Sequence, residues 1–175
     1  MTVVTISGLP GSGKTTVAKL LEEKTGLRYV YSGDIFRKLA KKHCMSLEEF
    51  GCFCEDNEDV DRELDDYQLK VLREDNVILE GRIAGWIAYN NNVESLKIFI
   101  KADLDTRVNR VIKRENGDFD KRKSEIVKRE RSEAFRYKNY YGIDVSDFSI
   151  YDLVIDSSDK TPLEIVEIIL QDFNK

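Results

Sequence analysis

The chain has 175 residues, of which 35% are charged and 41% are hydrophobic, a composition typical of one folded domain rather than of a disordered chain. No stretch approaches 18 consecutive apolar residues, so we expect no membrane-spanning helix. The net charge of −5 disfavours a general nucleic-acid binder. Three cysteines cannot all pair with one another, and no basic segment typical of a secretory signal precedes the first apolar run. We therefore expect a cytoplasmic protein, and we also expect a monomer.

Short β-branched runs alternate with helical patterns along the whole chain. Strands are predicted at 2–7, 27–31, 77–79, 96–100 and 153–155, and helices at 14–24, 34–42, 47–54, 60–73, 83–89, 103–114, 121–141 and 162–173. This alternation predicts an α/β fold of three layers, in which a parallel sheet is covered by helices on both faces. No linker divides the chain, so residues 1–175 are expected to form a single domain.

One motif lies between the first predicted strand and the first predicted helix. Residues 8–15, Gly-Leu-Pro-Gly-Ser-Gly-Lys-Thr, fit the phosphate-binding P-loop pattern G-x-x-x-x-G-K-[ST]. Lys14 is predicted to reach the β- and γ-phosphates of ATP as a catalytic residue, and the Thr15 hydroxyl is predicted to ligate Mg²⁺. The alternative is a plain glycine-rich turn. The predicted ATP-binding residues are Gly8, Leu9, Pro10, Gly11, Ser12, Gly13, Lys14, Thr15 and Thr16.

Charge is distributed unevenly along the chain. Residues 48–66 hold ten acidic residues and one basic residue, whereas residues 105–138 hold twelve basic and seven acidic residues. Runs of this kind are often solvated helix faces. The alternative is that the basic stretch receives an anionic substrate.

A second sequence motif follows the P-loop. Residues 31–37, Tyr-Ser-Gly-Asp-Ile-Phe-Arg, follow the second predicted strand. With the P-loop, they resemble the nucleoside monophosphate kinases, in which a Ser/Thr-Gly-Asp/Glu-x-x-Arg stretch begins the arm that binds the monophosphate (here about 33–73). The resemblance implies that Arg37 binds the acceptor phosphate and that Ser32 and Asp34 line the nucleotide pocket. A guanidinium suits this role because it offers two parallel donors to a phosphate; the alternative is a solvated helix residue.

The third predicted strand sharpens the resemblance. Residues 79–86 read Leu-Glu-Gly-Arg-Ile-Ala-Gly-Trp, which departs from the Asp-Gly-Phe-Pro-Arg of AMP kinases. The string resembles the short cytidylate kinases typical of archaea, in which Leu-Glu-Gly-Arg-x-Ala-Gly-Trp recurs. This resemblance implies that Gly81 and Arg82 contact the acceptor nucleotide and that Glu80 holds Mg²⁺ through water. The alternative for Glu80 is a structural partner of Arg82 or Lys14.

Two further residues belong to the predicted nucleotide site or lie near it. Trp86 is interpreted as core packing in preference to base stacking. Asp61, in the acidic run, is a candidate CMP-binding residue because a carboxylate can accept a hydrogen bond from the cytosine amino group.

The basic stretch places arginines on one helix face. Arg122, Arg129 and Arg136 are seven residues apart, so on an α-helix they drift by only about 20° per step. Residues 129–137 and 141–144 also resemble the cytidylate kinases. A hairpin of two helices with inward arginines suits a lid, at about 114–130, that closes over the phosphates. The predicted catalytic arginines are Arg110, Arg129 and Arg136.

These observations predict a P-loop kinase with a five-stranded parallel sheet in the order 2-3-1-4-5. The expected reaction is transfer of the γ-phosphoryl of ATP, with Mg²⁺ as cofactor, to CMP or dCMP. ATP and CMP or dCMP are the expected partners, without nucleic acid or membrane. One alternative is an AMP or UMP kinase, and another is a P-loop ATPase switch that binds a protein or RNA partner.

Overall fold

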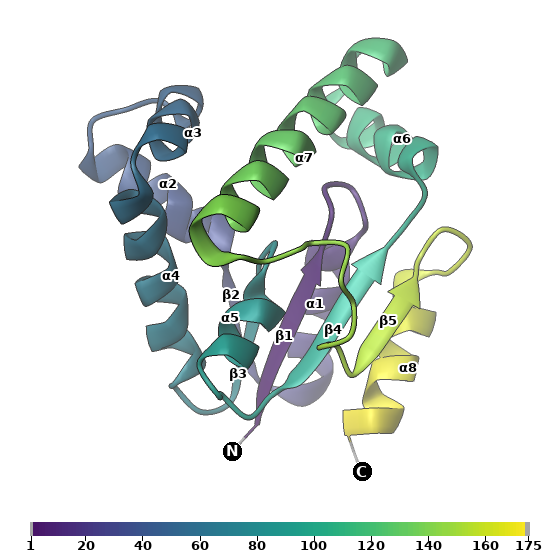
Figure 1. The fold of residues 1–175 in the computed structure, drawn as a ribbon. Coiled ribbons are helices and arrows are strands. Elements are labelled where there is room, and N and C mark those ends of the chain that lie inside the picture. The colour runs from purple at the N-terminus through teal and green to yellow at the C-terminus, as the bar shows by residue number, and fades with distance from the viewer. Residues whose placement is uncertain (1, 174–175) are drawn as a thin grey trace.

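The computed structural model describes residues 2–173, apart from the side chains of Leu47, Glu48, Glu55 and Asp61. Within this range, five strands form one parallel sheet in the order β2-β3-β1-β4-β5 (Figure 1). Val3 lies opposite Val77, and Val4 lies opposite Leu96. The strands are β1 (Val3–Gly8), β2 (Arg28–Tyr31), β3 (Val77–Glu80), β4 (Leu96–Lys101) and β5 (Leu153–Asp156). The predicted strand order and direction are confirmed.

Every predicted helix is present, with ends within two residues of those predicted. The helices are α1 (Lys14–Thr25), α2 (Ser32–Lys42), α3 (Leu47–Asp56), α4 (Glu58–Leu72), α5 (Ala84–Asn90), α6 (Leu104–Glu115), α7 (Phe119–Tyr141) and α8 (Pro162–Phe173). Helix α7 begins two residues before its predicted start because the Asp118 carboxylate accepts a hydrogen bond from Lys121 N at 3.0 Å and caps the helix. Among residues 2–173, none of the helices combines the length and apolar character needed to cross a bilayer.

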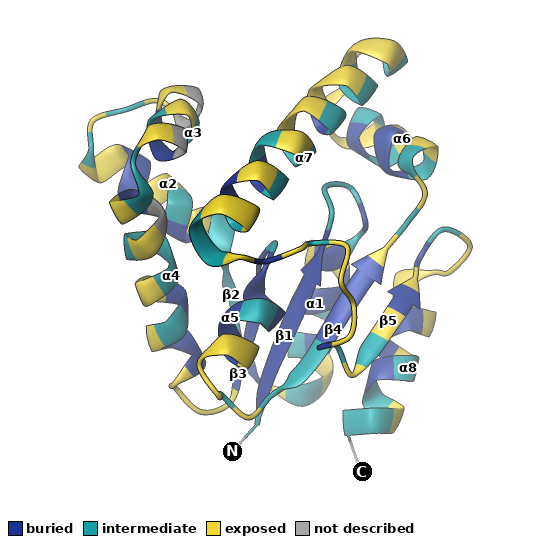
Figure 2. Cartoon of the chain, viewed as in Figure 1, coloured by how far each residue is buried: buried dark blue, intermediate teal, exposed yellow. Residues whose placement is uncertain are grey.

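The core consists of two apolar layers, one on each face of the sheet. Val4 and Ile6 of β1 pack on the face that α1 and α8 cover, whereas Val3 packs on the face that α4 and α5 cover. This alternation follows from the period of two along a strand. The buried residues therefore run along the strands and the helix surfaces that face them (Figure 2).

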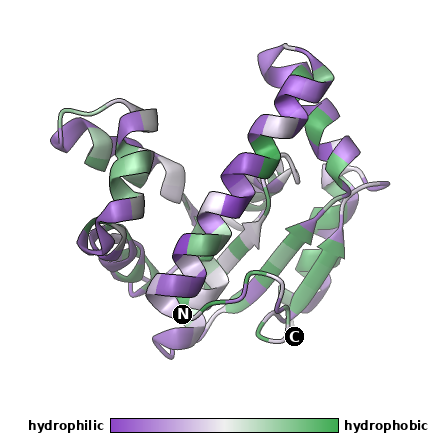
Figure 3. Cartoon of the chain, turned by 45° about the horizontal axis from the view of Figure 1, so that its top comes forward, coloured by the Kyte–Doolittle hydropathy of each residue, from purple (hydrophilic) through white to green (hydrophobic). Residues whose placement is uncertain are grey.

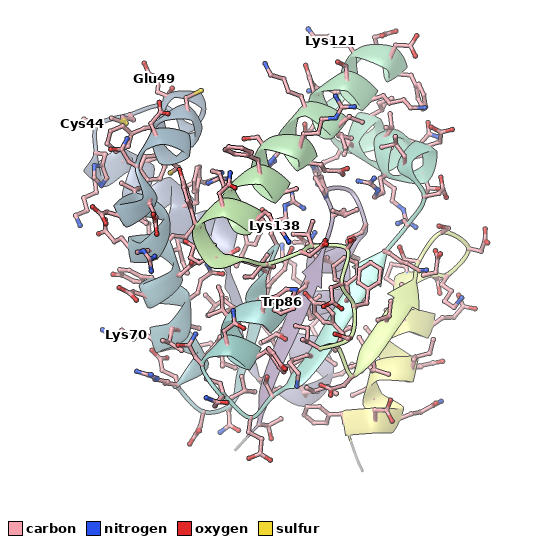
Figure 4. The ribbon with its side chains drawn as sticks, viewed as in Figure 1. Cys44, Glu49, Lys70, Trp86, Lys121 and Lys138 are labelled. Atoms are coloured by element: carbon pink, nitrogen blue, oxygen red, sulfur yellow. The ribbon has the colours of Figure 1, made fainter. Side chains whose placement is uncertain are left out.

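Two helical segments rise beyond the carboxyl ends of the strands. The α2–α4 arm (residues 32–72) follows β2, and the α6–α7 hairpin (residues 104–141) follows β4 (Figure 1). The hairpin is largely hydrophilic along its length, unlike the strands beneath it (Figure 3). Cys44 and Glu49 mark the far end of the arm, and Lys121 marks the tip of the hairpin (Figure 4). The loop after β1 lies between these two segments, at the edge of a parallel sheet where ligands bind in open α/β folds.

Candidate active site

The loop from Gly8 to Thr15 is shaped by two close backbone contacts. Gly8 has φ +149°, and a Cβ there would lie 2.2 Å from the carbonyl oxygen of Ile100. Gly11 has φ +76°, and its Cβ would lie 2.6 Å from the carbonyl oxygen of Arg107. A larger residue at either position would push the loop away from β4 or α6. The glycine pattern thus places a curled backbone at the start of α1, an arrangement that binds anions.

Lys14 is a buried amine that folds back on this loop. It is 7% exposed, and its Nζ donates a hydrogen bond to the carbonyl oxygen of Leu9 at 2.8 Å. Burial first, and then the positive charge of Arg82, lower the pKa of Lys14 to about 7. A phosphate chain in the loop would supply the negative charge that this amine lacks.

Thr15, Glu80 and Tyr29 form a hydrogen-bonded group beside Lys14. Thr15 Oγ1 donates to Glu80 Oε1 at 2.9 Å, and the Tyr29 hydroxyl donates to Glu80 Oε2. Burial and the hydrogen bond to Glu80 raise the pKa of Tyr29, so its hydroxyl stays protonated as a donor. Glu80 is 1% exposed, and neither Arg82 nor Lys14 hydrogen-bonds to it within the described residues. A hydroxyl and a carboxylate are oxygen ligands of the kind Mg²⁺ prefers, so this group fits the metal that the sequence predicts.

Ser32, Gly81 and Gln68 meet where β2, β3 and α4 converge. A Cβ on Gly81 would lie 2.8 Å from Ser32 Oγ and 2.9 Å from Gln68 Oε1. The structure therefore brings together two residues predicted for the acceptor nucleotide and adds Gln68, a buried polar residue at 3% exposure. Nothing in the local sequence distinguishes Gln68 from other polar residues of α4.

The other predicted acceptor residues of the arm lie farther out on α2. Arg37 and Asp34 are both exposed and form an ion pair, with Arg37 Nη1 2.8 Å from Asp34 Oδ1. The Arg37 guanidinium carbon also lies 5.8 Å from the centroid of the Tyr31 ring. The side chain of Asp61 lies outside the described residues.

A buried carboxylate on α7 holds two arginines of the site. Glu133 Oε2 lies 2.9 Å from Arg82 Nε, and Glu133 Oε1 accepts a hydrogen bond from Arg129 Nε at 2.9 Å. Arg82 Nη1 also donates to the carbonyl oxygen of Gly8 at 3.2 Å, which ties the pair to the P-loop. Burial opposes ionisation of Glu133, but the charges of Arg82, Arg129 and Arg136 outweigh it and hold the pKa of Glu133 below its usual range.

A second acid–arginine pair fixes α7 to the P-loop. Glu130 accepts a hydrogen bond from Arg107 Nη1, and the same nitrogen donates to the carbonyl oxygen of Pro10 at 3.2 Å. Arg136, the third arginine of the predicted lid face, is buried at 8% exposure and stacks beside Tyr137. Acids of α7 thus pair with arginines from other segments, Arg82 and Arg107, which a count of charges along the sequence does not reveal.

Arg110 joins the P-loop to the loop after β5. Its Nη1 donates to Ser157 Oγ at 2.9 Å and to the carbonyl oxygen of Ser12 at 3.3 Å, and its Nη2 donates to the carbonyl oxygen of Ser157 at 2.6 Å. Ser157 Oγ in turn donates to the carbonyl oxygen of Ser12 at 2.8 Å. Arg110 therefore reaches the P-loop from α6, as a site residue must, and it contacts the backbone of Ser12 and both the backbone and the hydroxyl of Ser157.

Trp86 lies on α5 and points toward the underside of α7 (Figure 4). It packs against the apolar cluster of α4 and α5, with its ring 5.8 Å from that of Tyr89, as the core interpretation predicts. It also lines a small cavity together with Gly8, Arg82 and Glu133. A change in the position of Arg82 or Glu133 can therefore alter the surroundings of the Trp86 indole.

A sequence model of the cytidylate kinase-like family matches residues 3–159. The chain belongs to this family. The cytidylate kinase of Methanocaldococcus jannaschii is 46% identical over 157 residues, which cover 89% of this chain and 88% of that protein. The cytidylate kinase of Archaeoglobus fulgidus is 44% identical over 169 residues, which cover 96% and 92%. The resemblance noted in residues 79–86 is thus confirmed along most of the chain.

Solved structures share the architecture at low identity. An uncharacterized protein from Eubacterium ventriosum aligns with a TM-score of 0.76 and 20% identity, over 100% of this chain and 99% of that chain. A shikimate kinase from Acinetobacter baumannii, solved with shikimate, aligns with a TM-score of 0.64 and 15% identity, over 99% and 93%. At these identities the likeness establishes the fold alone, which is that of P-loop kinases.

Proposed function

We propose that this protein transfers the γ-phosphoryl group of ATP to CMP or dCMP, giving ADP and the nucleoside diphosphate. The proposal rests on one observation above all: the P-loop and Arg82 meet at the carboxyl end of the sheet, where Arg82 Nη1 donates to the Gly8 carbonyl at 3.2 Å. A donor-phosphate loop and a candidate acceptor-phosphate arginine are thus adjacent. The relatives at 44–48% identity are named cytidylate kinases, which supports a cytidine monophosphate as the acceptor.

The residues of the P-loop are assigned to the donor. The backbone from Gly8 to Thr16 would hold the phosphate chain, and Lys14 would exchange its hydrogen bond to Leu9 for one to the β- and γ-phosphates. Arg110, Arg129 and Arg136 would stabilise the charge on the transferring phosphoryl group, for which no covalent enzyme intermediate is needed. The α6–α7 segment at about 114–130 is proposed as the lid that excludes water.

The acceptor is assigned to the α2–α4 arm and the end of β3. Arg37 and Arg82 would bind its phosphate, and Ser32 and Gly81 would lie against the nucleoside. Asp34 and Asp61 stay in the proposed CMP-binding set, with residues 33–73 as the arm that closes over the nucleoside. The Arg37–Asp34 pair is exposed, so a phosphate can reach the Arg37 guanidinium from solvent.

Mg²⁺ is proposed as the cofactor, held by Thr15 directly and by Glu80 through water. When bound, the ion would neutralise charge on the β- and γ-phosphate oxygens. The described residues include no group of three His, Cys, Asp or Glu side chains that could hold a metal, in keeping with an ion ligated largely by phosphates and water.

The direct test is a product assay. Purified protein, ATP and Mg²⁺ are incubated with CMP, dCMP, UMP or AMP in turn, and the diphosphates are separated by anion-exchange chromatography. The proposal expects rapid formation of CDP or dCDP with stoichiometric ADP. Preferential phosphorylation of AMP or UMP would contradict the acceptor, and ATP hydrolysis at one rate with or without monophosphates would contradict kinase function altogether.

A further inference from the structure

Glu133 has no part in the reaction proposed above, yet it occupies the centre of the basic site. Its side chain is 11% exposed and lies on the inner face of α7. Each carboxylate oxygen engages a different arginine at 2.9 Å, Arg82 through Oε2 and Arg129 through Oε1. The two arginines come from segments that the sequence separates widely, the loop after β3 and α7, so the carboxylate is what joins them.

The arginines that Glu133 holds are suited to bind phosphate. Arg82 is tied to the P-loop through the Gly8 carbonyl, and the side chain of Arg129 is 64% exposed despite its bond to Glu133. A carboxylate presents two anionic oxygens to a guanidinium in the same way that a phosphate does. Glu133 therefore satisfies these arginines with the chemistry that a substrate phosphate would offer.

Packing alone does not explain a carboxylate at this position. A buried ion pair contributes little net stability compared with apolar residues of similar volume. Without Glu133, however, Lys14, Arg82, Arg129 and Arg136 would lose the negative charge that they share, because the neighbouring Glu130 is paired with Arg107 and Glu80 is bonded by Thr15 and Tyr29. Their mutual repulsion would then favour any anion that entered.

We propose that Glu133 is a positioning residue that occupies Arg82 and Arg129 as an internal substitute for phosphate, and that substrate phosphates displace it. In the ligand-free protein it keeps both guanidinium groups ordered and aimed at the site. It also competes with free inorganic anions, which bind without the added contacts of a nucleoside. This inference rests on the phosphate-binding roles proposed above for the two arginines.

The test compares pyrophosphate binding to the wild type and to Glu133→Gln. The amide keeps the size of the side chain but loses its charge and can accept a hydrogen bond from only one arginine. Because hydrogen bonds to charged groups are the stronger ones, we expect E133Q to bind pyrophosphate about tenfold more tightly by titration calorimetry.

A control variant, a second readout and a second substitution of Glu133 separate this role from others. Glu74→Gln removes a carboxylate from an exposed ion pair with Arg28 at the opposite end of the sheet, and it should leave pyrophosphate affinity unchanged. Trp86 is the single tryptophan of the chain and lines the cavity that Arg82 and Glu133 also line, so its fluorescence should change when pyrophosphate binds to the wild type. Glu133→Asp retains the charge but has a shorter reach, and about threefold tighter binding is expected of it; E133D carries the test if E133Q does not fold.

Pyrophosphate affinity that is unchanged or weaker in the folded variant would overturn the inference. A purely structural role would weaken binding together with thermal stability, and a direct contact to the nucleoside would raise KM for CMP without tightening pyrophosphate. The proposed function fails separately, because it is judged on the wild type: absence of CMP phosphorylation there would contradict the function, whatever E133Q binds.

Discussion

The buried amine of Lys14 predicts that ATP binding is coupled to proton uptake. With its pKa lowered to about 7 by burial and by Arg82, Lys14 is largely neutral at pH 8 in the ligand-free protein. ATP brings negative charge to the amine, which raises its pKa and restores the proton. The expected uptake per ATP is about 0.9 proton at pH 8, about half a proton at pH 7 and about 0.1 proton at pH 6.

The sign of this effect fixes the pH dependence of affinity. Because the bound state holds more protons, ATP should bind less tightly as pH rises above 7. A pKa of about 7 implies that Kd increases about fivefold from pH 7 to pH 8, and about tenfold for each further pH unit. The phosphates themselves contribute little above pH 7, since their second pKa is near 6.

Titration calorimetry in two buffers of different ionisation enthalpy measures the uptake directly. HEPES and Tris are suitable, and the difference in observed enthalpy gives the number of protons. Lys14→Arg serves as a control because a guanidinium remains charged throughout this range and cannot take up a proton. Equal proton uptake at pH 6 and pH 8, or the same uptake in wild type and K14R, would refute the argument that burial of Lys14 sets its charge.

Three further predictions address other parts of the site. Arg37→Ala should raise KM for CMP by about 30- to 1000-fold, equivalent to about 2–4 kcal/mol for a lost phosphate contact, and leave KM for ATP nearly constant. Lys38→Ala, the control, should change neither KM. A loss of ATP affinity in R37A would place Arg37 on the donor side. Tyr29→Phe should raise the Mg²⁺ concentration that gives half-maximal activity, because the carboxylate it bonds loses a donor that orients it, and an unchanged magnesium titration would contradict this role. Gly11→Ala should lower the melting temperature and abolish ATP binding, since its Cβ would lie 2.6 Å from a backbone oxygen. Gly26→Ala, whose Cβ would have no atom within 4 Å, should bind ATP normally. Normal ATP binding by G11A would show that the loop can shift.

Local pattern was sufficient to predict the helices and strands because most of them are bounded by clear signals. Gly26 and Gly142 end α1 and α7 in the left-handed conformation, and the P-loop motif marks the turn between the first strand and the first helix. The order of the strands followed from the resemblance to P-loop kinases, not from any one strand. One end of each of α2, α3, α4 and α7 lies two residues from its predicted place, and at the start of α7 this is because Asp118, a capping residue outside the apolar pattern, sets the end.

The site was predicted only in part because its contacts join distant segments. Tyr29 and Glu80 are 51 residues apart, and no local pattern marks a tyrosine in β2 as the partner of a carboxylate in β3. Glu133 could not be predicted as a site residue for a different reason. In a count of charges along the basic stretch, it only lowers the net positive charge. Its spacing of four from Arg129 was the one available signal of the pair.

The central position of β1 affects how the nascent chain folds. Of the five described strands it is translated first, and the strands on either side of it begin only at Val77 and Leu96. At synthesis rates of about 5–20 residues per second, β1 stays unpaired for several seconds until β3 and β4 have been synthesised. The helices of the arm can already form during this time from local contacts. The P-loop packs on the carbonyls of Ile100 and Arg107, so its shape cannot exist before those residues are made. ATP, the proposed donor, can therefore assist folding only after Arg107 has been translated.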